Sequence, residues 1–205
     1  PKLPCHDCFD YYFTIPRWKM TLSLFLKYAN LLIIFKKMQN SFIAIDFETA
    51  INHHICSVGM VTVTNGIIID EYHALIQPPN NAYNWHNIQV HGISQSDTAN
   101  EPLFDEVYPE IKKRIYGQTL VAHNESFDRN VLKKTMADYR LDYNELQLAD
   151  RWECTMKIYR AKGYRAKLNL CCERHGIELK HHDALSDALG CAKLYLIAQE
   201  TASNF

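Results

Sequence analysis

Three stretches with the residue pattern of β-strands follow one another closely between residues 42 and 76. They cover residues 42–47, about 56–63 and about 67–76, and they are rich in β-branched and aromatic residues. Asn65-Gly66 separates the last two, and Asn-Gly is the preferred dipeptide of a two-residue hairpin turn. Strands joined by such short connections pair antiparallel, so this part of the chain predicts an antiparallel meander.

The remainder of the chain alternates between strand and helix patterns. The predicted elements are a helix at 104–116, a strand at 119–123, a helix from about Ser126, a short strand near 147–154, and helices around 168–175 and 184–199. Strands first as a meander and then in alternation with helices predict an α/β fold. We expect a mixed five-stranded sheet flanked by helices.

The first 38 residues differ in composition from the rest of the 205-residue chain. They hold six Lys or Arg and two Asp, which leaves 16 basic and 21 acidic residues in 39–205. We expect residues 39–205 to form the domain and residues 1–38 to be an N-terminal extension. The extension is interpreted either as an extra helix or as non-native sequence ahead of Met38. The intact mass of the protein from its native cell distinguishes the two.

Composition excludes several classes of protein. Apolar residues make up 47% and charged residues 22%, as in globular rather than disordered or fibrous chains. The apolar run at 22–35 is interrupted by Lys27 and is too short for a membrane span, which needs about 20 apolar residues. Seven cysteines, an odd number without repeating spacing, indicate reduced thiols. We therefore expect a cytoplasmic protein without a membrane partner, whose nucleic-acid contacts are small and local because the domain is acidic.

Two carboxylates stand at the end of the first predicted strand, in the sequence SFIAIDFETA. Side chains alternate between the faces of a strand, so Asp46 and Glu48 point the same way, opposite Phe47. Two like charges at this separation repel each other, and burial increases the penalty. A hard cation such as Mg²⁺ removes it and leaves positions for substrate phosphates. The alternative is that the strand ends at Ile45 and both acids are solvated.

A third acid follows the strand at 119–123, in the sequence VAHNESFDRNVL. Asn124 or Ser126 is the expected N-cap, which places Asp128 in the first turn of the next helix. The helix dipole favours an acid there in any helix. The junction is the more informative feature, because α/β sheets present their sites where a strand ends and a helix starts.

A fourth acid lies in the sequence KHHDALSDALGCAKLYL. Asp183 is the expected N-cap, so His182 lies just before the helix and Asp187 about one turn inside it. The small residues around Asp187 indicate close approach of another part of the chain. His181 is an adjacent alternative to His182, and a histidine beside a helix start is more often structural.

Together these segments supply a set of metal ligands and a base. Four acids in one pocket require about two divalent ions, which lie ~3.5–4 Å apart in phosphoryl-cleaving sites. We predict that His182, with an ordinary pKa near neutrality, acts as the base. The predicted ligands are Asp46, Glu48, Asp128 and Asp187.

Four motifs, in this order, resemble those of the DEDDh 3′-5′ exonucleases, the superfamily of the proofreading epsilon subunit of DNA polymerase III. They are DFET at 46–49, VHGIS at 90–94, HNESFD at 123–128 and HHDALSDA at 181–188, and the resemblance covers roughly residues 41–199. None of the four acids or the histidine departs from the family pattern. The resemblance implies a ribonuclease H-like fold, and hydrolytic release of nucleoside monophosphates from a 3′ end with two Mg²⁺ or Mn²⁺ ions.

The resemblance also implies a role for each acid. Asp46 would touch both metals. Glu48 and Asp187 would complete the site of the metal that activates water, and Asp128 would help to hold the other. His182 would take the proton of the attacking water.

Four further residues are substrate-binding candidates through the same resemblance. Thr49, His91 and Phe127 would contact the terminal nucleotide, and Asn124 would support the pocket. For two of them the alternatives are structural: His91 as a loop histidine and Phe127 as a core residue.

A basic segment at 157–167 holds five Lys or Arg and no acid, with Tyr159 and Tyr164 among them. Such a segment predicts phosphate contacts with a tyrosine stacked on a base. A solvated surface is the alternative interpretation.

Three functions remain in competition. The first is a 3′-5′ exonuclease acting on single-stranded or frayed DNA ends, in DNA repair or proofreading. The second is an RNA-directed enzyme of the oligoribonuclease or ribonuclease T kind, and the third is a non-catalytic accessory module. The expected partners are DNA or RNA 3′ ends, while a polymerase or repair partner and the oligomeric state cannot be read from the sequence.

Overall fold

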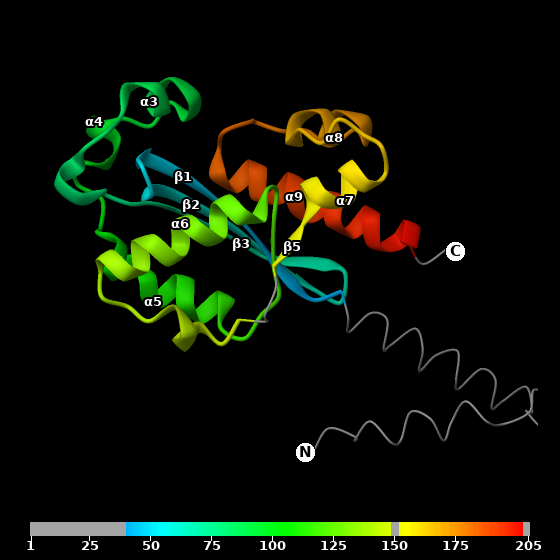
Figure 1. The fold of residues 1–205 in the computed structure, drawn as a ribbon, viewed down its shortest axis with the longest axis horizontal. Coiled ribbons are helices and arrows are strands. Elements are labelled where there is room, and N and C mark those ends of the chain that lie inside the picture. Colours follow the sequence, from blue (N-terminus) through cyan, green and yellow to red (C-terminus); the bar gives the residue numbers. More distant parts are fainter. Residues whose placement is uncertain (1–39, 149–151, 203–205) are drawn as a thin grey trace, which may run out of the picture. The chain divides into compact units, whose positions relative to one another are not determined.

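The computed structural model describes residues 40–148 and 152–202, and the predicted extension at 1–38 lies outside them. A single mixed sheet of five strands, in the order β3-β2-β1-β4-β5, forms the centre of this part of the chain (Figure 1). Its strands are β1 (Phe42–Ile51), β2 (His54–Thr64), β3 (Ile67–Leu75), β4 (Leu120–Ala122) and β5 (Glu153–Cys154). The predicted five-stranded mixed sheet is confirmed, because β1–β2 and β2–β3 pair antiparallel whereas β1–β4 and β4–β5 pair parallel.

The hairpin turn between β2 and β3 has the expected turn chemistry. Asn65 and Gly66 have φ angles of 54° and 77°, so both central residues adopt the left-handed conformation that a type I′ turn requires. Strand β1 runs past Asp46 and Glu48 to Ile51, so the alternative that it ends at Ile45 is wrong. The pairing of β1 with β2 becomes irregular only after Glu48.

Helices and 3-10 helices connect and cover the strands. In chain order they are η2 (Pro79–Asn81), α3 (Trp85–His91), α4 (Gln95–Thr98), α5 (Phe104–Ile115), α6 (Glu125–Asp138), η3 (Tyr143–Leu146), α7 (Thr155–Ala161), α8 (Leu168–Arg174) and α9 (Ala184–Ala202). Four of the predicted helices are confirmed as α5, α6, α8 and α9. The short helices α3, α4 and α7 were not predicted, and the strand expected near 147–154 is limited to Glu153–Cys154 among the described residues.

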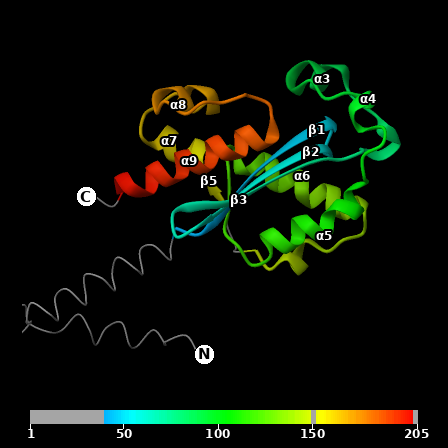
Figure 2. The ribbon, with the colours of Figure 1, turned by 180° about the vertical axis from the view of Figure 1, so that it is seen from behind.

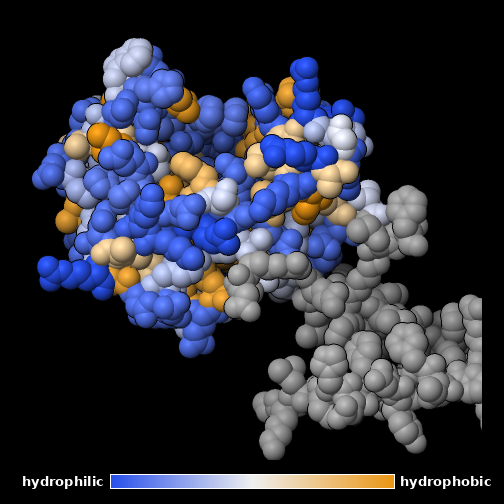
Figure 3. All heavy atoms as spheres, viewed as in Figure 1, coloured by the Kyte–Doolittle hydropathy of each residue, from blue (hydrophilic) through white to orange (hydrophobic). Residues whose placement is uncertain are grey.

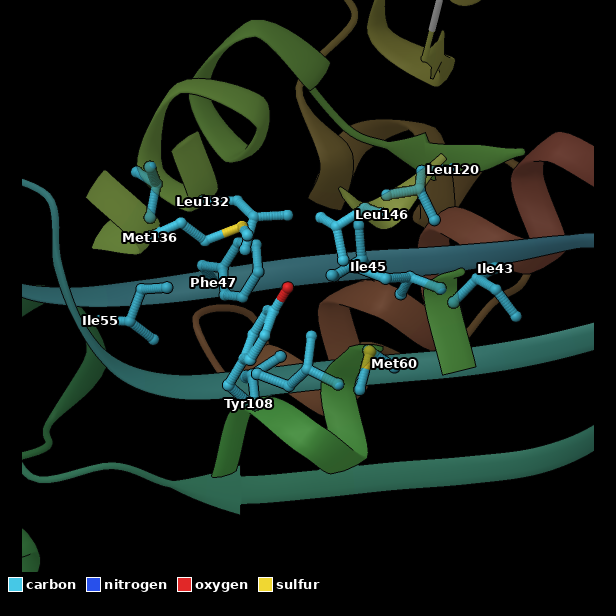
Figure 4. Close-up of a cluster of buried hydrophobic side chains, with 14 of the residues drawn as sticks. Ile43, Ile45, Phe47, Ile55, Met60, Tyr108, Leu120, Leu132, Met136 and Leu146 are labelled. Carbon is cyan, nitrogen blue, oxygen red and sulfur yellow. The ribbon is translucent and has the colours of Figure 1, made fainter. Parts of the chain in front are cut away.

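Helices α5 and α6 cover one face of the sheet. The buried side chains of α5 and α6 meet those of β1 and β2 in the largest hydrophobic cluster, which Figure 4 shows in close-up. Ile43, Ile45 and Phe47 of β1 all point into this cluster, as strand alternation requires. This face of the sheet therefore carries the main core.

Helix α9 covers the other face, and α7 and α8 pack beside α9 (Figures 1 and 2). Phe42 and Ala44 of β1 contact this side, where they pack with Ala188 and Ala192 of α9. Burial of alternate β1 residues on opposite faces gives three layers, helices–sheet–helices.

Gly59 lets the first turn of α9 lie directly on the sheet. A Cβ atom at Gly59 would lie 2.1 Å from the backbone oxygen of Ala184, which is far closer than two atoms can approach. Gly59 is also the residue of β2 that pairs with Asp46. The close approach that the small residues around Asp187 predict is therefore the contact of α9 with β2, immediately beside Asp46.

The face of the described residues that Figure 3 shows is mainly hydrophilic. Figure 3 shows apolar residues scattered over one face rather than gathered in a single band. Within residues 40–148 and 152–202, no helix has the length and apolar character that a membrane crossing needs. The apolar run at 22–35 lies outside this part of the chain.

Candidate active site

Strand β1 places two carboxylates on the face that α9 covers. Phe47 is buried in the core of the opposite face, with 2% of its surface exposed. Asp46 and Glu48 flank it in the chain and therefore project toward α9. Both acids are half-buried at the point where the helix begins.

The short strand β4 leaves room for the carboxylate of Asp128. The pairing of β4 with β1 ends at Ala44, so the edge of β1 beyond that residue faces α6 rather than a strand. The backbone N–H of Phe47 donates to Asp128 Oδ1 at 3.2 Å. Asp128 lies in the first turn of α6, as predicted, and only 1% of its surface is exposed. A helix on one face of the sheet thus delivers an acid to the strand that carries the other two.

Asn124 is the N-cap of α6, as one of the two expected alternatives, but its side chain does not cap the helix. Its φ angle is 76°, a conformation that Asn tolerates better than most residues. Asn124 Oδ1 accepts a hydrogen bond from Ser126 Oγ at 3.1 Å. The strand-to-helix connection is therefore a tight bend rather than a standard cap.

Helix α9 brings the fourth acid and both histidines. Asp183 caps the helix as predicted, because its Oδ1 accepts the N–H of Ser186 at 3.1 Å. Asp187 is buried one turn inside, and its Oδ2 accepts the backbone N–H of His182 at 3.1 Å. Nδ1 of His181 lies 3.0 Å from the same oxygen, and the two imidazole rings stack with centroids 3.8 Å apart.

The structure brings the predicted ligands together. Asp46, Glu48 and Asp187 each offer a carboxylate oxygen, and these three atoms lie within 4.8 Å of one another. Among the described residues, none of the four acids forms an ion pair with Lys or Arg, whereas Asp187 pairs with His181. An oxygen-rich cluster of this kind fits hard divalent cations.

Burial and mutual repulsion raise the pKa values of these acids in the metal-free protein. Burial is the largest cause for all four, and it raises the pKa of Asp46 well above its usual range. The pKa values of Glu48 and Asp128 rise to about 8, although the N–H of Phe47 opposes the shift at Asp128. The pKa of Asp187 also rises. A bound cation stabilises the charged form of these carboxylates and lowers their pKa values again.

Thr49 and His91 are linked by a hydrogen bond, and Asn87, which was not predicted from the sequence, binds the same carbonyl oxygen. Thr49 is buried, and its carbonyl oxygen accepts hydrogen bonds from Asn87 Nδ2 at 2.8 Å and from His91 Nε2 at 3.2 Å. Nδ1 of His91 accepts the N–H of Ile93, so Nε2 carries the proton. Asn87 and His91 share one face of α3 at the i, i+4 spacing, a signal that becomes readable once residues 85–91 are recognised as a helix.

Phe127 is an exposed residue of α6, with 44% of its surface accessible. The interpretation of Phe127 as a core residue is therefore wrong. It directly precedes Asp128 in the first turn of α6.

The basic segment at 157–167 is in part committed to other contacts. Tyr159 is only 1% exposed and cannot stack on a base, which leaves Tyr164 as the tyrosine to which that prediction applies. Lys157 Nζ lies 2.7 Å from Oε1 of the buried Glu125, an ion pair that sequence reasoning missed. Arg174 lies over the ring of Tyr164, 4.2 Å from its centroid.

Comparison with known proteins identifies the family. The exonuclease family model (RNase_T) matches residues 43–195. The 3′-5′ exonuclease DinG of Staphylococcus aureus (strain USA300) is 31% identical over 172 residues, which cover 78% of this chain and 18% of DinG. The chain thus spans less than a fifth of the length of the curated relatives it matches.

Solved structures have the same fold. Exonuclease X in complex with 5′ overhanging duplex DNA is 25% identical with a TM-score of 0.63, over 79% of this chain and 93% of that one. The nuclease domain of 3′hExo, a DEDDh family member bound to rAMP, is 19% identical with a TM-score of 0.68, over 79% and 92%. The ribonuclease H-like fold that the motifs imply is confirmed. Because the family model spans most of the chain and includes all three acidic segments, the chain belongs to the DEDDh family of 3′-5′ exonucleases, which depend on divalent metal ions.

Proposed function

We propose that the protein hydrolyses single-stranded or frayed DNA from the 3′ end and releases nucleoside monophosphates. The observation that carries this proposal is the convergence of Asp46, Glu48 and Asp187, whose oxygens lie within 4.8 Å, with Asp128 bonded to the same strand. DinG, at 31% identity, and exonuclease X, at 25% identity, support an activity on nucleic-acid ends.

We assign the four acids to two Mg²⁺ or Mn²⁺ ions. When bound, such ions stabilise the charge on the attacking and leaving oxygens of a phosphodiester. Asp46 would contact both ions, Glu48 and Asp187 would complete one site, and Asp128 would complete the other. The N–H of Phe47 donates to Oδ1 of Asp128, and this hydrogen bond orients the carboxylate in the absence of a metal ion.

We assign the role of general base to His182. Burial, and then the neighbouring His181, lower the pKa of His182, so its ring is neutral and able to accept a proton near pH 7. Asp187 accepts the N–H of His182 and thereby holds its backbone, whose φ angle is 67°. Nδ1 of His181 instead contacts Asp187 directly, which suits a positioning residue.

Thr49, His91, Asn124 and Phe127 are the proposed substrate-binding residues. Phe127 has the exposed ring that stacking on a base requires. His91 acts through Thr49, whose carbonyl it holds, and burial lowers the pKa of His91 so that it remains a neutral donor.

Removal of the Phe127 ring is expected to raise KM for single-stranded DNA by about 5- to 150-fold, because stacking contributes about 1–3 kcal/mol per base. The melting temperature should change little, since the ring is exposed. Steady-state kinetics of Phe127→Ala measure the effect. The matched control is Tyr116→Ala, a similarly exposed aromatic residue at the end of α5. Equal KM values for Phe127→Ala and wild type contradict the assignment.

The choice of DNA over RNA is tested by digestion of 5′-labelled DNA and RNA oligomers of the same sequence. We expect shortening from the 3′ end on both, with the faster rate on DNA. Faster trimming of RNA supports the RNA-directed alternative. No shortening of either supports the non-catalytic alternative and contradicts the proposal.

The place of this activity in the cell follows from the same proposal. We propose cytoplasmic DNA repair as the setting, with DNA 3′ ends as the partner. Kinship with the polymerase III epsilon subunit rests on the sequence motifs alone.

A further inference from the structure

We propose that His53, His54 and Asp138 form a second metal site that takes a borderline transition ion such as Zn²⁺. The three residues share no member with the carboxylate cluster. Each offers one ligand atom, and the three atoms lie within 4.8 Å of one another. His53 lies in the β1–β2 turn, His54 is the first residue of β2, and Asp138, 85 residues after His53, is the last residue of α6.

The geometry directs both imidazoles at one carboxylate oxygen. Nε2 of His53 lies 2.7 Å from Asp138 Oδ2, and Nε2 of His54 lies 3.5 Å from the same atom. These separations bracket the ~3.3 Å between neighbouring ligands of a tetrahedral ion with metal–ligand distances of about 2.0–2.1 Å. Small rotations of the rings therefore suffice to place the donors around one ion.

Local structure holds the histidines in this arrangement. Asn52 has a φ angle of 54°, so the turn that carries His53 and His54 is tight. Thr135 Oγ1 donates to the carbonyl oxygen of His53 at 2.7 Å, which ties the turn to the last part of α6. The two rings meet edge to face with centroids 4.9 Å apart. Rings restrained before binding lose less freedom when an ion binds.

The donor set selects the class of ion. Two imidazole nitrogens and one carboxylate suit Zn²⁺ and its neighbours in the transition series, whereas Mg²⁺ prefers oxygen ligands alone. The histidine side chains are 25% exposed and the Asp138 side chain is 44% exposed, so an ion can enter from solvent. Water can complete the coordination on that open side.

The position of this site gives it a structural role. Its ligands join the end of the hairpin containing β1, which carries Asp46 and Glu48, to the end of α6, which carries Asp128. In Figure 4, Ile55 of β2 and Met136 of α6 lie at the same end of the core cluster. A metal at this point would tie together the two elements that bring three of the four catalytic acids into the site.

The test is titration of Zn²⁺ alone, followed by calorimetry, into protein that carries Asp46→Asn to weaken binding at the carboxylate cluster. His53→Gln added to this background is expected to remove one tight equivalent of Zn²⁺ per chain. Co²⁺ is expected to give visible absorption of tetrahedral character that the same substitution abolishes. Asp138→Asn keeps an oxygen that accepts a hydrogen bond from the His53 ring, and it should weaken Zn²⁺ binding at least tenfold. This variant replaces His53→Gln in the test if His53→Gln does not fold.

The control is His86→Gln, which removes an exposed histidine outside the cluster and should change neither readout. Zn²⁺ should also raise the melting temperature of the parent by about 2–4 °C or more, and not that of His53→Gln. If the parent, His53→Gln and Asp138→Asn bind Zn²⁺ with equal stoichiometry and affinity, the contact of His53 with Asp138 is an ordinary ion pair and the proposal is wrong. Without added Zn²⁺, Mg²⁺-dependent hydrolysis by His53→Gln in the wild-type background should equal that of wild type, so failure of the zinc site and failure of the proposed function are distinguishable.

Discussion

Asp128→Asn is expected to reduce the rate of DNA hydrolysis by about 10³-fold or more and, without metal, to raise the melting temperature near pH 8. The loss of activity follows because metal-borne charge stabilisation contributes several kcal/mol and each 1.36 kcal/mol is tenfold in rate. The gain in stability follows because Asn keeps an oxygen that accepts the N–H of Phe47 but carries no charge into a buried site. Rates of oligomer shortening and thermal unfolding measure the two effects.

The pH dependence of stability has a definite sign. The pKa of Asp128 is about 8 in the folded, metal-free protein, against 3.8 for an ordinary aspartate. Below pH 4 the carboxyl is protonated in both states, and wild type and Asp128→Asn should be equally stable. Between pH 4 and 8 only the unfolded state ionises readily, so wild type loses stability as the pH rises. The difference in melting temperature should grow through this window and level off above pH 8.

The same experiment has an internal control. Mg²⁺ should raise the melting temperature of wild type and have a smaller effect on Asp128→Asn, because binding to the folded state alone stabilises it. Glu71→Gln removes an exposed acid of β3 and should leave both the rate and the unfolding curve unchanged. If metal-free Asp128→Asn has a lower melting temperature than wild type at pH 8, the buried charge of Asp128 does not destabilise the folded protein and this explanation is wrong.

Gly59→Ala is expected to displace the first turn of α9 and to abolish most activity without touching any catalytic side chain. The added Cβ would lie 2.1 Å from the oxygen of Ala184, and backbone on both sides limits relaxation. Overpacking of this kind costs about 1–3 kcal/mol or more, which corresponds to a fall of about 2–12 °C in melting temperature. A shift of 1 Å in Asp187 relative to Asp46 reduces the rate by about 10²-fold.

Gly163→Ala is the control that distinguishes displacement of α9 from a general loss of stability. Gly163 has a φ angle of 79° and no atom within 4 Å of an added Cβ, so Ala there costs only about 1–2 kcal/mol of backbone strain. Hydrolysis by Gly163→Ala, measured below its melting temperature, should match that of wild type. Equal activities of Gly59→Ala and wild type would show that α9 tolerates the displacement.

Residue patterns with a local physical cause predicted most of the fold. The Asn65-Gly66 turn, the strands of the meander and helices α5, α6, α8 and α9 depend on turn chemistry and periodicity within one segment. The placement of Asp46 and Glu48 on one face follows from strand alternation in the same way. Gathering of the four acids was predicted from their positions at a strand end and at two helix starts, and the order of the motifs, which resembles that of a known family, supported it.

Features that depend on contacts between distant segments were not predictable. Helix α3 has only seven residues, and its periodicity is lost in a stretch that also contains turn residues. Its pair Asn87 and His91 therefore gave no sign of holding the carbonyl of Thr49. Tyr159 was one of two tyrosines in the basic segment considered for stacking on a base, but its ring packs in the cluster with α8 and α9. Whether one residue of a charged helix is buried depends on which distant segments of the chain pack against it.

The most direct test of the central claim follows a 5′-labelled single-stranded DNA oligomer with Mg²⁺ and compares wild type with Asp46→Ala, His182→Ala and His181→Ala. We predict a ladder that shortens from the 3′ end and requires metal. It should be absent with Asp46→Ala, strongly slowed with His182→Ala and slowed less with His181→Ala. No metal-dependent shortening by wild type, on this oligomer or its RNA counterpart, would contradict the account and leave the carboxylate cluster as a site that binds without cutting.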